Sequence, residues 1–90
     1  MLRLVHTTQF RKDLKLARKR GRDLTLLGSV IHCLQKEEPL PVANRDHALV
    51  GDYIGFRECH IQPDWLLIYR VDRGQLILVL QRTGTHSDLM

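Results

Sequence analysis

Two tight turns divide the C-terminal third of this 90-residue chain into three apolar segments, and this pattern limits the possible folds most strongly. The turns lie at 62–64 (Gln-Pro-Asp) and 72–74 (Asp-Arg-Gly), and Pro, Asp and Gly are typical turn residues. The segments 55–61, 65–71 and 76–80 have the composition of strands. Two short connections in succession favour antiparallel neighbours, so we expect a β-meander.

Two segments that follow a short predicted strand at 3–6 have the apolar spacing of helices. Phe10, Leu14 and Ala17 recur on one face of the first, which Thr7 or Thr8 can cap and Gly21 can end. The second segment begins at the predicted cap Asp23 and has a broader apolar face. Its prolines at 39 and 41 prevent continuation, so we predict two antiparallel helices.

The order of these segments predicts one α+β domain covering residues 1–90, because the chain is too short for two separate cores. The expected architecture is β-α-α-β-β-β, with two N-terminal helices packed on a mainly antiparallel four-stranded sheet. A stretch of weak periodicity at 39–54 is longer than an ordinary connection and carries His47. Long loops of this kind are frequently functional.

Positive charge is concentrated in the first predicted helix. Seven basic residues and one acid, Asp13, lie between Arg11 and Arg22, so this window has a net charge of 7 − 1 = +6. The rest of the chain has seven basic and nine acidic residues, or −2. Clustered Lys and Arg suit a polyanionic partner such as nucleic acid, but a solvated helix face explains the charge equally well.

The N-terminus lacks the apolar region of a signal peptide, and no apolar run is long enough to span a membrane. We therefore expect a cytoplasmic protein with no membrane contact. Cys33 and Cys59 are far apart in the sequence and form no Cys-x-x-Cys pair. Both are expected to be buried, unpaired residues.

Residues capable of acid–base chemistry lie at strand ends. His60 is near the end of one predicted strand, Asp64 begins the next, and Arg82 ends the last. A meander makes His60 and Asp64 spatial neighbours and allows Arg82 to join them. His47 and His86 lie on flanking flexible segments that can reach the same place.

This set suits cleavage of RNA without a metal. Histidine can exchange a proton near neutral pH, and an Arg fork can stabilise charge on a phosphate. In such a reaction the 2′-hydroxyl attacks the adjacent phosphate and the 5′-oxygen leaves. Each residue also has a purely structural reading: a surface histidine, a turn aspartate or a salt-bridged arginine.

Other chemistries have weaker support. A metal could be bound by the four residues His47, His60, Asp64 and His86, but their spacing matches no standard zinc pattern. No serine or cysteine nucleophile motif and no phosphate-binding glycine loop is present. We therefore expect neither a metal nor another cofactor.

Four stretches resemble the YafQ family of bacterial toxins, which belongs to the RelE/ParE superfamily. They are the segment 45–49 with Gly51, the segment 55–69, the Arg-Thr-Gly-Thr-His sequence at 82–86 and the basic segment 10–17. The resemblance implies a RelE-like fold and a type II toxin that cuts mRNA in the ribosomal A site. Such an mRNA interferase needs no metal.

The resemblance also implies roles for individual residues. The implied catalytic set is His47, His60, Asp64, Arg82 and His86. The implied substrate-binding residues are Trp65, Arg57, Met90, Lys15, Arg18, Lys19 and Arg20, of which the last four lie on the basic helix and would contact ribosomal RNA. Met90 stands where the family has a terminal aromatic residue, which predicts weaker stacking on a base.

The implied partner is an acidic antitoxin, commonly with a ribbon-helix-helix domain that binds operator DNA. Two other functions remain open at this point. A ParE-like inhibitor of DNA gyrase shares the fold but does not need the His/Asp/Arg set. A non-catalytic nucleic-acid-binding module would use the basic helix alone.

Overall fold

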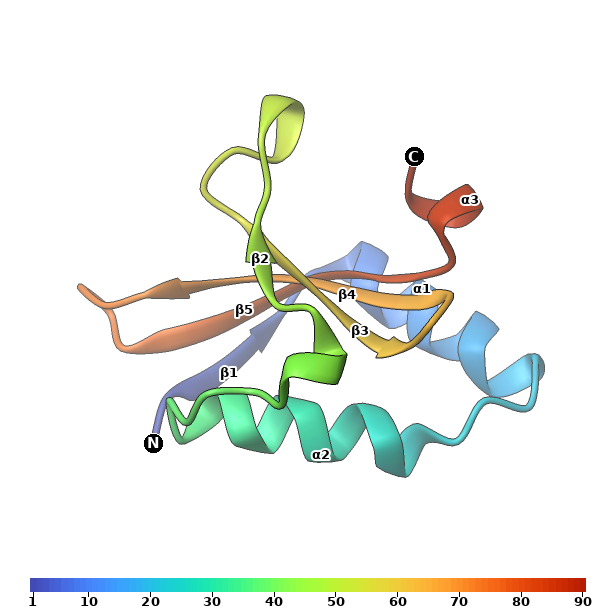
Figure 1. Ribbon diagram of the computed structural model, residues 1–90, viewed down its shortest axis with the longest axis horizontal. Coiled ribbons are helices and arrows are strands. Elements are labelled where there is room, and N and C mark those ends of the chain that lie inside the picture. The colour runs from blue at the N-terminus through green and yellow to red at the C-terminus, as the bar shows by residue number, and fades with distance from the viewer.

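The computed structural model describes residues 1–90 as an α+β domain built on one five-stranded sheet (Figure 1). The strands are β1 (Arg3–His6), β2 (His47–Ala48), β3 (Arg57–Gln62), β4 (Trp65–Asp72) and β5 (Ile77–Gly84), in the spatial order β1-β5-β4-β3-β2. The helices are α1 (Thr8–Lys19), α2 (Leu24–Gln35) and α3 (His86–Leu89), with two 3₁₀ turns, η1 (Val42–Asn44) and η2 (Gly51–Tyr53).

The predicted meander is confirmed, because β3, β4 and β5 pair antiparallel in chain order. The sheet has five strands instead of the predicted four, since His47 and Ala48 in the long loop pair with the start of β3. The first strand lies beside the last and runs parallel to it, with Arg3 opposite Ile77 and His6 opposite Leu80. The sheet is therefore mixed at this edge.

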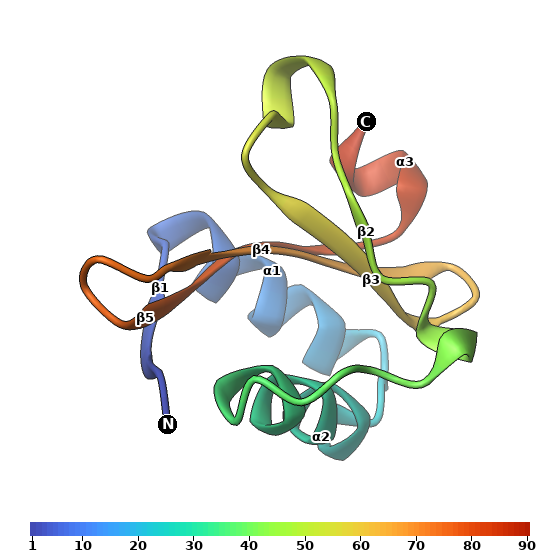
Figure 2. The same cartoon turned by 60° about the vertical axis from the view of Figure 1, so that its left-hand side comes forward.

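The two N-terminal helices begin and end as their sequence predicts. The Thr7 hydroxyl accepts a hydrogen bond from the Phe10 N–H, and the Asp23 carboxylate accepts one from the Thr25 N–H. Gly21 follows α1 with a positive φ of 74°, a conformation that favours glycine. The chain then reverses direction, and α1 and α2 lie on the same side of the sheet (Figures 1 and 2).

Apolar side chains fill the space between these helices and the sheet. The main core includes Phe10, Ala17, Leu27, Val30, Leu34, Cys59, Trp65, Leu67, Tyr69, Leu78 and Leu80. The loop around η2 and the short helix α3 rise from the opposite face (Figures 1 and 2). There Leu66, Ile68 and Leu89 form a second small cluster.

Two expectations need correction. The tail beyond β5 is not a flexible segment, because residues 86–89 form α3. Cys59 is buried as expected, but Cys33 is only half-buried, and its thiol donates to the Glu38 carbonyl over 3.4 Å.

None of the helices has the length and apolar character needed to cross a membrane.

Candidate active site

Polar side chains from three strands share the face of the sheet that α1 and α2 leave uncovered. The direct cross-strand partners from β2 to β5 are His47, Glu58, Ile68 and Arg82. Residues that are directly opposite one another project from the same side of a sheet. Ile68 belongs to the small cluster on the α3 side, so the other three residues of this row are placed on that face too.

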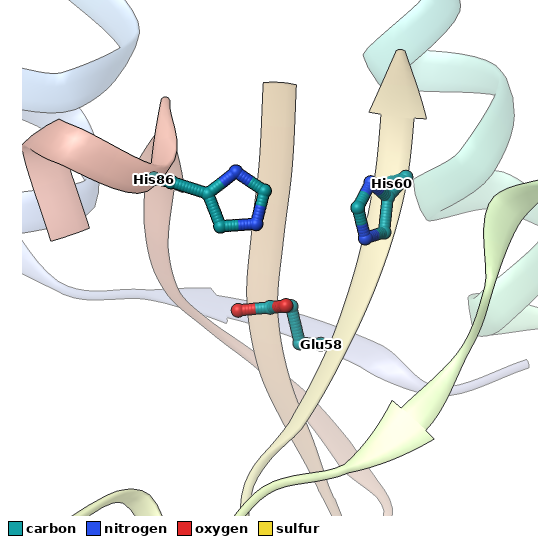
Figure 3. Close-up of side chains that lie close together, drawn as sticks. All are labelled: Glu58, His60 and His86. Atoms are coloured by element: carbon teal, nitrogen blue, oxygen red, sulfur yellow. The ribbon is translucent and has the colours of Figure 1, made fainter. Parts of the chain in front are cut away.

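His60 and His86 complete a compact cluster with Glu58 (Figure 3). His60 follows Glu58 by two residues on β3, and His86 comes from the first turn of α3. The two imidazole centroids are 5.8 Å apart. One side-chain oxygen or nitrogen from each of the three residues lies within 4.8 Å of the others. The predicted approach of His86 to the sheet end is thus observed.

In all three histidines of the site, the Nδ1 atom of the ring contacts an oxygen atom of the protein. His60 Nδ1 lies 3.1 Å from the Pro63 carbonyl oxygen, and His47 Nδ1 lies 2.7 Å from that of Arg45. A carbonyl oxygen can only accept, so Nδ1 carries the hydrogen in both rings. His86 Nδ1 faces a carboxylate in the same way. In their neutral forms, His60 and His86 therefore keep the Nε2 lone pair for proton transfer, whereas His47 Nε2 faces a carboxylate oxygen of Glu58.

Asp64 contacts His86 and not His60, although the meander predicted His60 as its neighbour. Its Oδ1 atom accepts from the His86 N–H over 3.1 Å and from the His86 Nδ1 over 2.9 Å. These hydrogen bonds from the His86 ring and backbone lower the pKa of the Asp64 carboxyl. The carboxylate is therefore ionised at neutral pH and fixes the orientation of the His86 ring.

Glu58 is the site residue that sequence reasoning missed. Only 4 % of its surface is exposed, and its Oε2 atom has no hydrogen-bond partner. The other oxygen, Oε1, lies 3.6 Å from His47 Nε2. A buried carboxylate oxygen without a partner is costly unless a ligand or water satisfies it. The available signal was the spacing of Glu58 and His60, because residues two apart share one face of a strand.

The helix that carries His86 is anchored through Asp88. The Asp88 and Thr85 side chains form a reciprocal capping box around the first turn of α3. Arg20, at the end of α1, donates to both Asp88 oxygens over 2.7 and 3.2 Å. This guanidinium holds the pKa of the Asp88 carboxyl well below its usual range. Leu89 adds a buried apolar contact on the sheet.

Arg82 is oriented by a carboxylate on α1. Its Nε and Nη2 donate to the two oxygens of Asp13 over 2.8 and 3.0 Å. The hydrogen bond and charge of Asp13 raise the pKa of Arg82 further above neutrality. A register shift in the β4–β5 pairing precedes Arg82, with Tyr69 opposite Leu80 but Ile68 opposite Arg82. Such bulges are frequent beside active sites because they redirect a side chain.

Two predicted substrate-binding residues lie elsewhere. Trp65 is 0 % exposed, its Nε1 donates to the Thr83 hydroxyl, and the Arg22 guanidinium lies over its ring. It offers no free surface for a base, so this prediction is wrong. Arg57 projects on the face opposite Glu58 and pairs with Asp46, which separates it from the histidine cluster. The C-terminal Met90 is exposed beyond α3, and no contact of the structure tests its predicted role.

The basic residues of α1 divide into two groups. Lys15, Arg18 and Lys19 are exposed and form no ion pair, so their charge is available to an external partner. Arg20 was predicted with them, but its guanidinium already pairs with Asp88. The first helix therefore both presents positive charge and holds α3.

A metal ion could be bound by this cluster, although none was expected. Two imidazole nitrogens and one carboxylate oxygen suit a transition metal, and the Oε2 atom of Glu58 has no hydrogen-bond partner within the protein. The set differs from the four residues considered from sequence, since Glu58 is included and Asp64 instead bonds to His86.

Comparison with known proteins identifies close relatives. The sequence profile of the family described as bacterial toxin of type II toxin-antitoxin system, YafQ, matches residues 2–90. The mRNA interferase toxin YafQ of Escherichia coli K12 is 40 % identical over 85 residues, which are 93 % of this chain and 90 % of the relative.

Solved structures agree over the whole chain. A metal-bound toxin from Helicobacter pylori superposes with a TM-score of 0.95 at 43 % identity, covering 100 % of both chains. The toxin in a crystal structure of the E. coli DinJ–YafQ complex superposes with a TM-score of 0.90 at 37 % identity. That match covers 100 % of this chain and 99 % of the other.

Proposed function

Since this chain belongs to the YafQ family of bacterial toxins of type II toxin–antitoxin systems, we propose that it is an endoribonuclease that cuts mRNA in the ribosomal A site. Its E. coli relative at 40 % identity is an mRNA interferase toxin. The observation that carries the proposal is the pairing of His60 and His86, whose Nε2 atoms are both free for proton transfer.

The proposed reaction is an internal transfer at one phosphate. One histidine removes the proton of a 2′-hydroxyl, and O2′ attacks the adjacent phosphorus. The bond between phosphorus and the 5′-oxygen breaks, and the other histidine protonates that oxygen. The products are a 2′,3′-cyclic phosphate and a 5′-hydroxyl, so no water, metal or redox partner enters the step. Asp64 holds His86 in the required tautomer.

Arg82 and Glu58 support the charges of this step. Arg82 retains free N–H groups that can donate to phosphate oxygens as negative charge develops. The unpartnered oxygen of Glu58 can accept a hydrogen bond from the 2′-hydroxyl, which only RNA has. We therefore propose that Glu58 joins His47, His60, Asp64, Arg82 and His86 in the active site.

We further propose that the exposed basic residues of α1 hold the protein on the ribosome. Lys15, Arg18 and Lys19 can neutralise phosphates of ribosomal RNA and release counterions. This model predicts that substitution of Lys19 by Glu weakens ribosome association and reduces its dependence on salt.

A cognate acidic antitoxin is the proposed protein partner. The E. coli relative is solved in a DinJ–YafQ toxin–antitoxin complex. We propose that the antitoxin of this chain covers the histidine cluster and carries a ribbon-helix-helix domain that binds operator DNA. We also propose a cytoplasmic location, because the proposed action is on ribosomes.

The proposed chemistry proceeds without a metal. A related Helicobacter pylori toxin has been solved in a metal-bound form. We propose that Glu58, His60 and His86 could hold a divalent transition-metal ion in this chain as well. Such an ion would occupy nitrogen lone pairs that the histidines need for proton transfer, so it would inhibit cleavage.

The test is to map mRNA cleavage after brief expression of the wild-type protein and the His86→Ala variant. Codon-phased cuts that disappear in the variant would support the proposal. His32→Ala is a matched control, because His32 is exposed on α2. Growth arrest with DNA damage and no mRNA cuts would instead favour gyrase inhibition. Full toxicity of His86→Ala would favour a non-catalytic nucleic-acid-binding module.

A further inference from the structure

Asp13 is the one acid in the basic first helix, and its carboxylate is directed at the sheet. Only 8 % of its surface is exposed, although it lies in a helix that is otherwise rich in exposed Lys and Arg. Its position, five residues after the start of α1 at Thr8, lies beside β5. A buried carboxylate in this setting needs several donors to offset its lost hydration.

Four donors converge on this carboxylate. Oδ1 accepts from Gln9 Nε2 over 3.1 Å and from Arg82 Nη2 over 3.0 Å. Oδ2 accepts from Arg82 Nε over 2.8 Å and from the Thr83 N–H over 3.2 Å. Two consecutive residues of β5 are therefore held at the point where the register shift occurs.

The contacts with Asp13 occupy one edge of the Arg82 guanidinium and leave the other edge for a second partner, and the Tyr53 side chain lies close enough to the guanidinium to help raise its pKa. A guanidinium has five N–H groups, and the pair formed by Nε and Nη2 uses two of them. The remaining three lie on Nη1 and Nη2, which together form a second fork that matches two oxygens of one phosphate. The Arg82 side chain is 22 % exposed, so part of it is open to solvent.

We propose that Asp13 is a positioning residue that presents the Nη1/Nη2 fork of Arg82 to the scissile phosphate. The inference rests on the proposed function, since it assumes that Arg82 contacts the reacting phosphate. Asp13 itself does not touch RNA; it acts by fixing the direction of the guanidinium. An unrestrained arginine would have to lose side-chain entropy at each turnover.

Asp13→Asn is the direct test, because it keeps the shape but has a single acceptor oxygen. Its amide N–H groups would face the donors of Arg82 and Thr83. In single-turnover cleavage on programmed ribosomes, the maximal rate should fall about 10- to 100-fold. The concentration for half-maximal rate should change by less than about two-fold, because Asp13 does not contact RNA. The Arg82 Nε–H proton, followed by its resonance, should exchange faster with water. This readout reports directly on the hydrogen bonding of the Arg82 side chain.

A double-mutant cycle distinguishes positioning from a general structural role. If Asp13 acts through Arg82, the double variant Asp13→Asn/Arg82→Ala should be no slower than Arg82→Ala. Equal rate losses in both backgrounds would overturn the inference, and so would a wild-type rate for Asp13→Asn beside a slow Arg82→Ala. A wild-type rate for Arg82→Ala would instead contradict the assignment of Arg82 in the proposed function.

Two further variants control for folding. Asp72→Asn removes a carboxylate that accepts backbone hydrogen bonds at the far end of the β4–β5 hairpin, and it should keep the wild-type rate. Asp13→Glu keeps the charge but displaces it by one methylene, so its rate should lie between those of Asp13→Asn and the wild type. If the Asn variant does not fold, a wild-type rate for Asp13→Glu with a displaced guanidinium would overturn the inference.

Discussion

Asp64 binds His86 through two hydrogen bonds to one carboxylate oxygen, one from the backbone N–H and one from ring Nδ1, at 3.1 and 2.9 Å. This contact joins the β3–β4 turn to the C-terminal helix. It selects the tautomer in which His86 Nε2 is free. Substitution at Asp64 therefore tests the tautomer without removing the histidine.

Asp64→Asn should lower the cleavage rate about 10-fold or more, because an amide can donate to Nδ1 and so favour the opposite tautomer. Stability should change little, since Asp64 is exposed. The measurement is single-turnover cleavage with urea unfolding as a parallel assay. Asp52→Asn, at an exposed position of η2, is the matched control and should retain full activity. Equal activity of both variants would contradict the proposed role.

Gly84→Ala should destabilise α3 and reduce cleavage. A Cβ atom at this position would lie 2.9 Å from Asp88 Oδ2 and 3.0 Å from Asp88 Cβ, so the capping carboxylate must move. We expect a loss of about 1–3 kcal/mol in the free energy of unfolding. Gly28→Ala is a control with the opposite expected effect. Gly28 lies inside α2, and a Cβ atom there would have no heavy atom within 4 Å. That variant should gain up to about 1 kcal/mol in stability.

The two cysteines should differ in reactivity. Burial raises the pKa of the Cys59 thiol to about 12, and the residue is 0 % exposed. Cys33 is only half-buried. A thiol reagent at pH 8 should therefore label only Cys33 in the folded protein and both cysteines in denaturant. Labelling of Cys59 under native conditions, detected by mass spectrometry of peptides, would show that the sheet opens.

Acid should weaken the fold chiefly through Asp88, whose carboxyl pKa is lowered. The carboxyl pKa of Asp64 is lowered too, but Asp64 is exposed and should contribute little. A carboxyl with a lower pKa in the folded state stabilises the fold above its unfolded value, and this contribution is lost as pH falls through the folded value. From these groups we expect constant stability between about pH 5 and 8 and a decline below about pH 4. Urea unfolding at pH 6 and pH 3 measures this decline. It should be smaller in Asp88→Asn, and an unchanged decline would exclude Asp88 as a contributor.

Chelation should leave cleavage intact, whereas added copper or zinc should inhibit it. EDTA removes free metal, and the proposed proton transfers need none. An ion held by Glu58, His60 and His86 would block the free nitrogens. Glu58→Gln should weaken such binding, which isothermal titration calorimetry can measure separately from activity. A rate that falls with EDTA and recovers with metal would overturn the proposed chemistry.

The strands and helices were predictable where turn residues and helix caps coincide with the ends of apolar segments. The turns at 62–64 and 72–74 defined the meander, and the caps at Thr7 and Asp23 defined the helix starts. The parallel pairing of β1 with β5 was not predictable, because a four-residue strand carries no information about its direction or its neighbour. The short strand β2 depends on only two residue pairs, which no sequence periodicity marks.

The site was predictable only in part, because side-chain direction follows from tertiary contacts. The positions of His60 and Asp64 at strand ends predicted that both lie at one end of the sheet. The partner of Asp64, however, is His86 on α3, and the sequence of the eight-residue tail did not predict this helix. Glu58 was hidden because a lone acid in a strand usually faces solvent. Trp65 was misassigned because an aromatic next to catalytic residues can equally face the core.

The pairing of β1 with β5 also sets the order of events during synthesis. Thr7 at the end of β1 donates its N–H to the Leu80 carbonyl and its hydroxyl to the Gln81 carbonyl, across more than seventy positions of the chain. Contacts of this separation form late and cannot form while one partner is still untranslated. A nascent chain therefore has neither a closed sheet nor an assembled histidine cluster until residues 77–86 have emerged. If the chain cleaves mRNA as proposed, this activity can arise only after its C-terminal residues have been made.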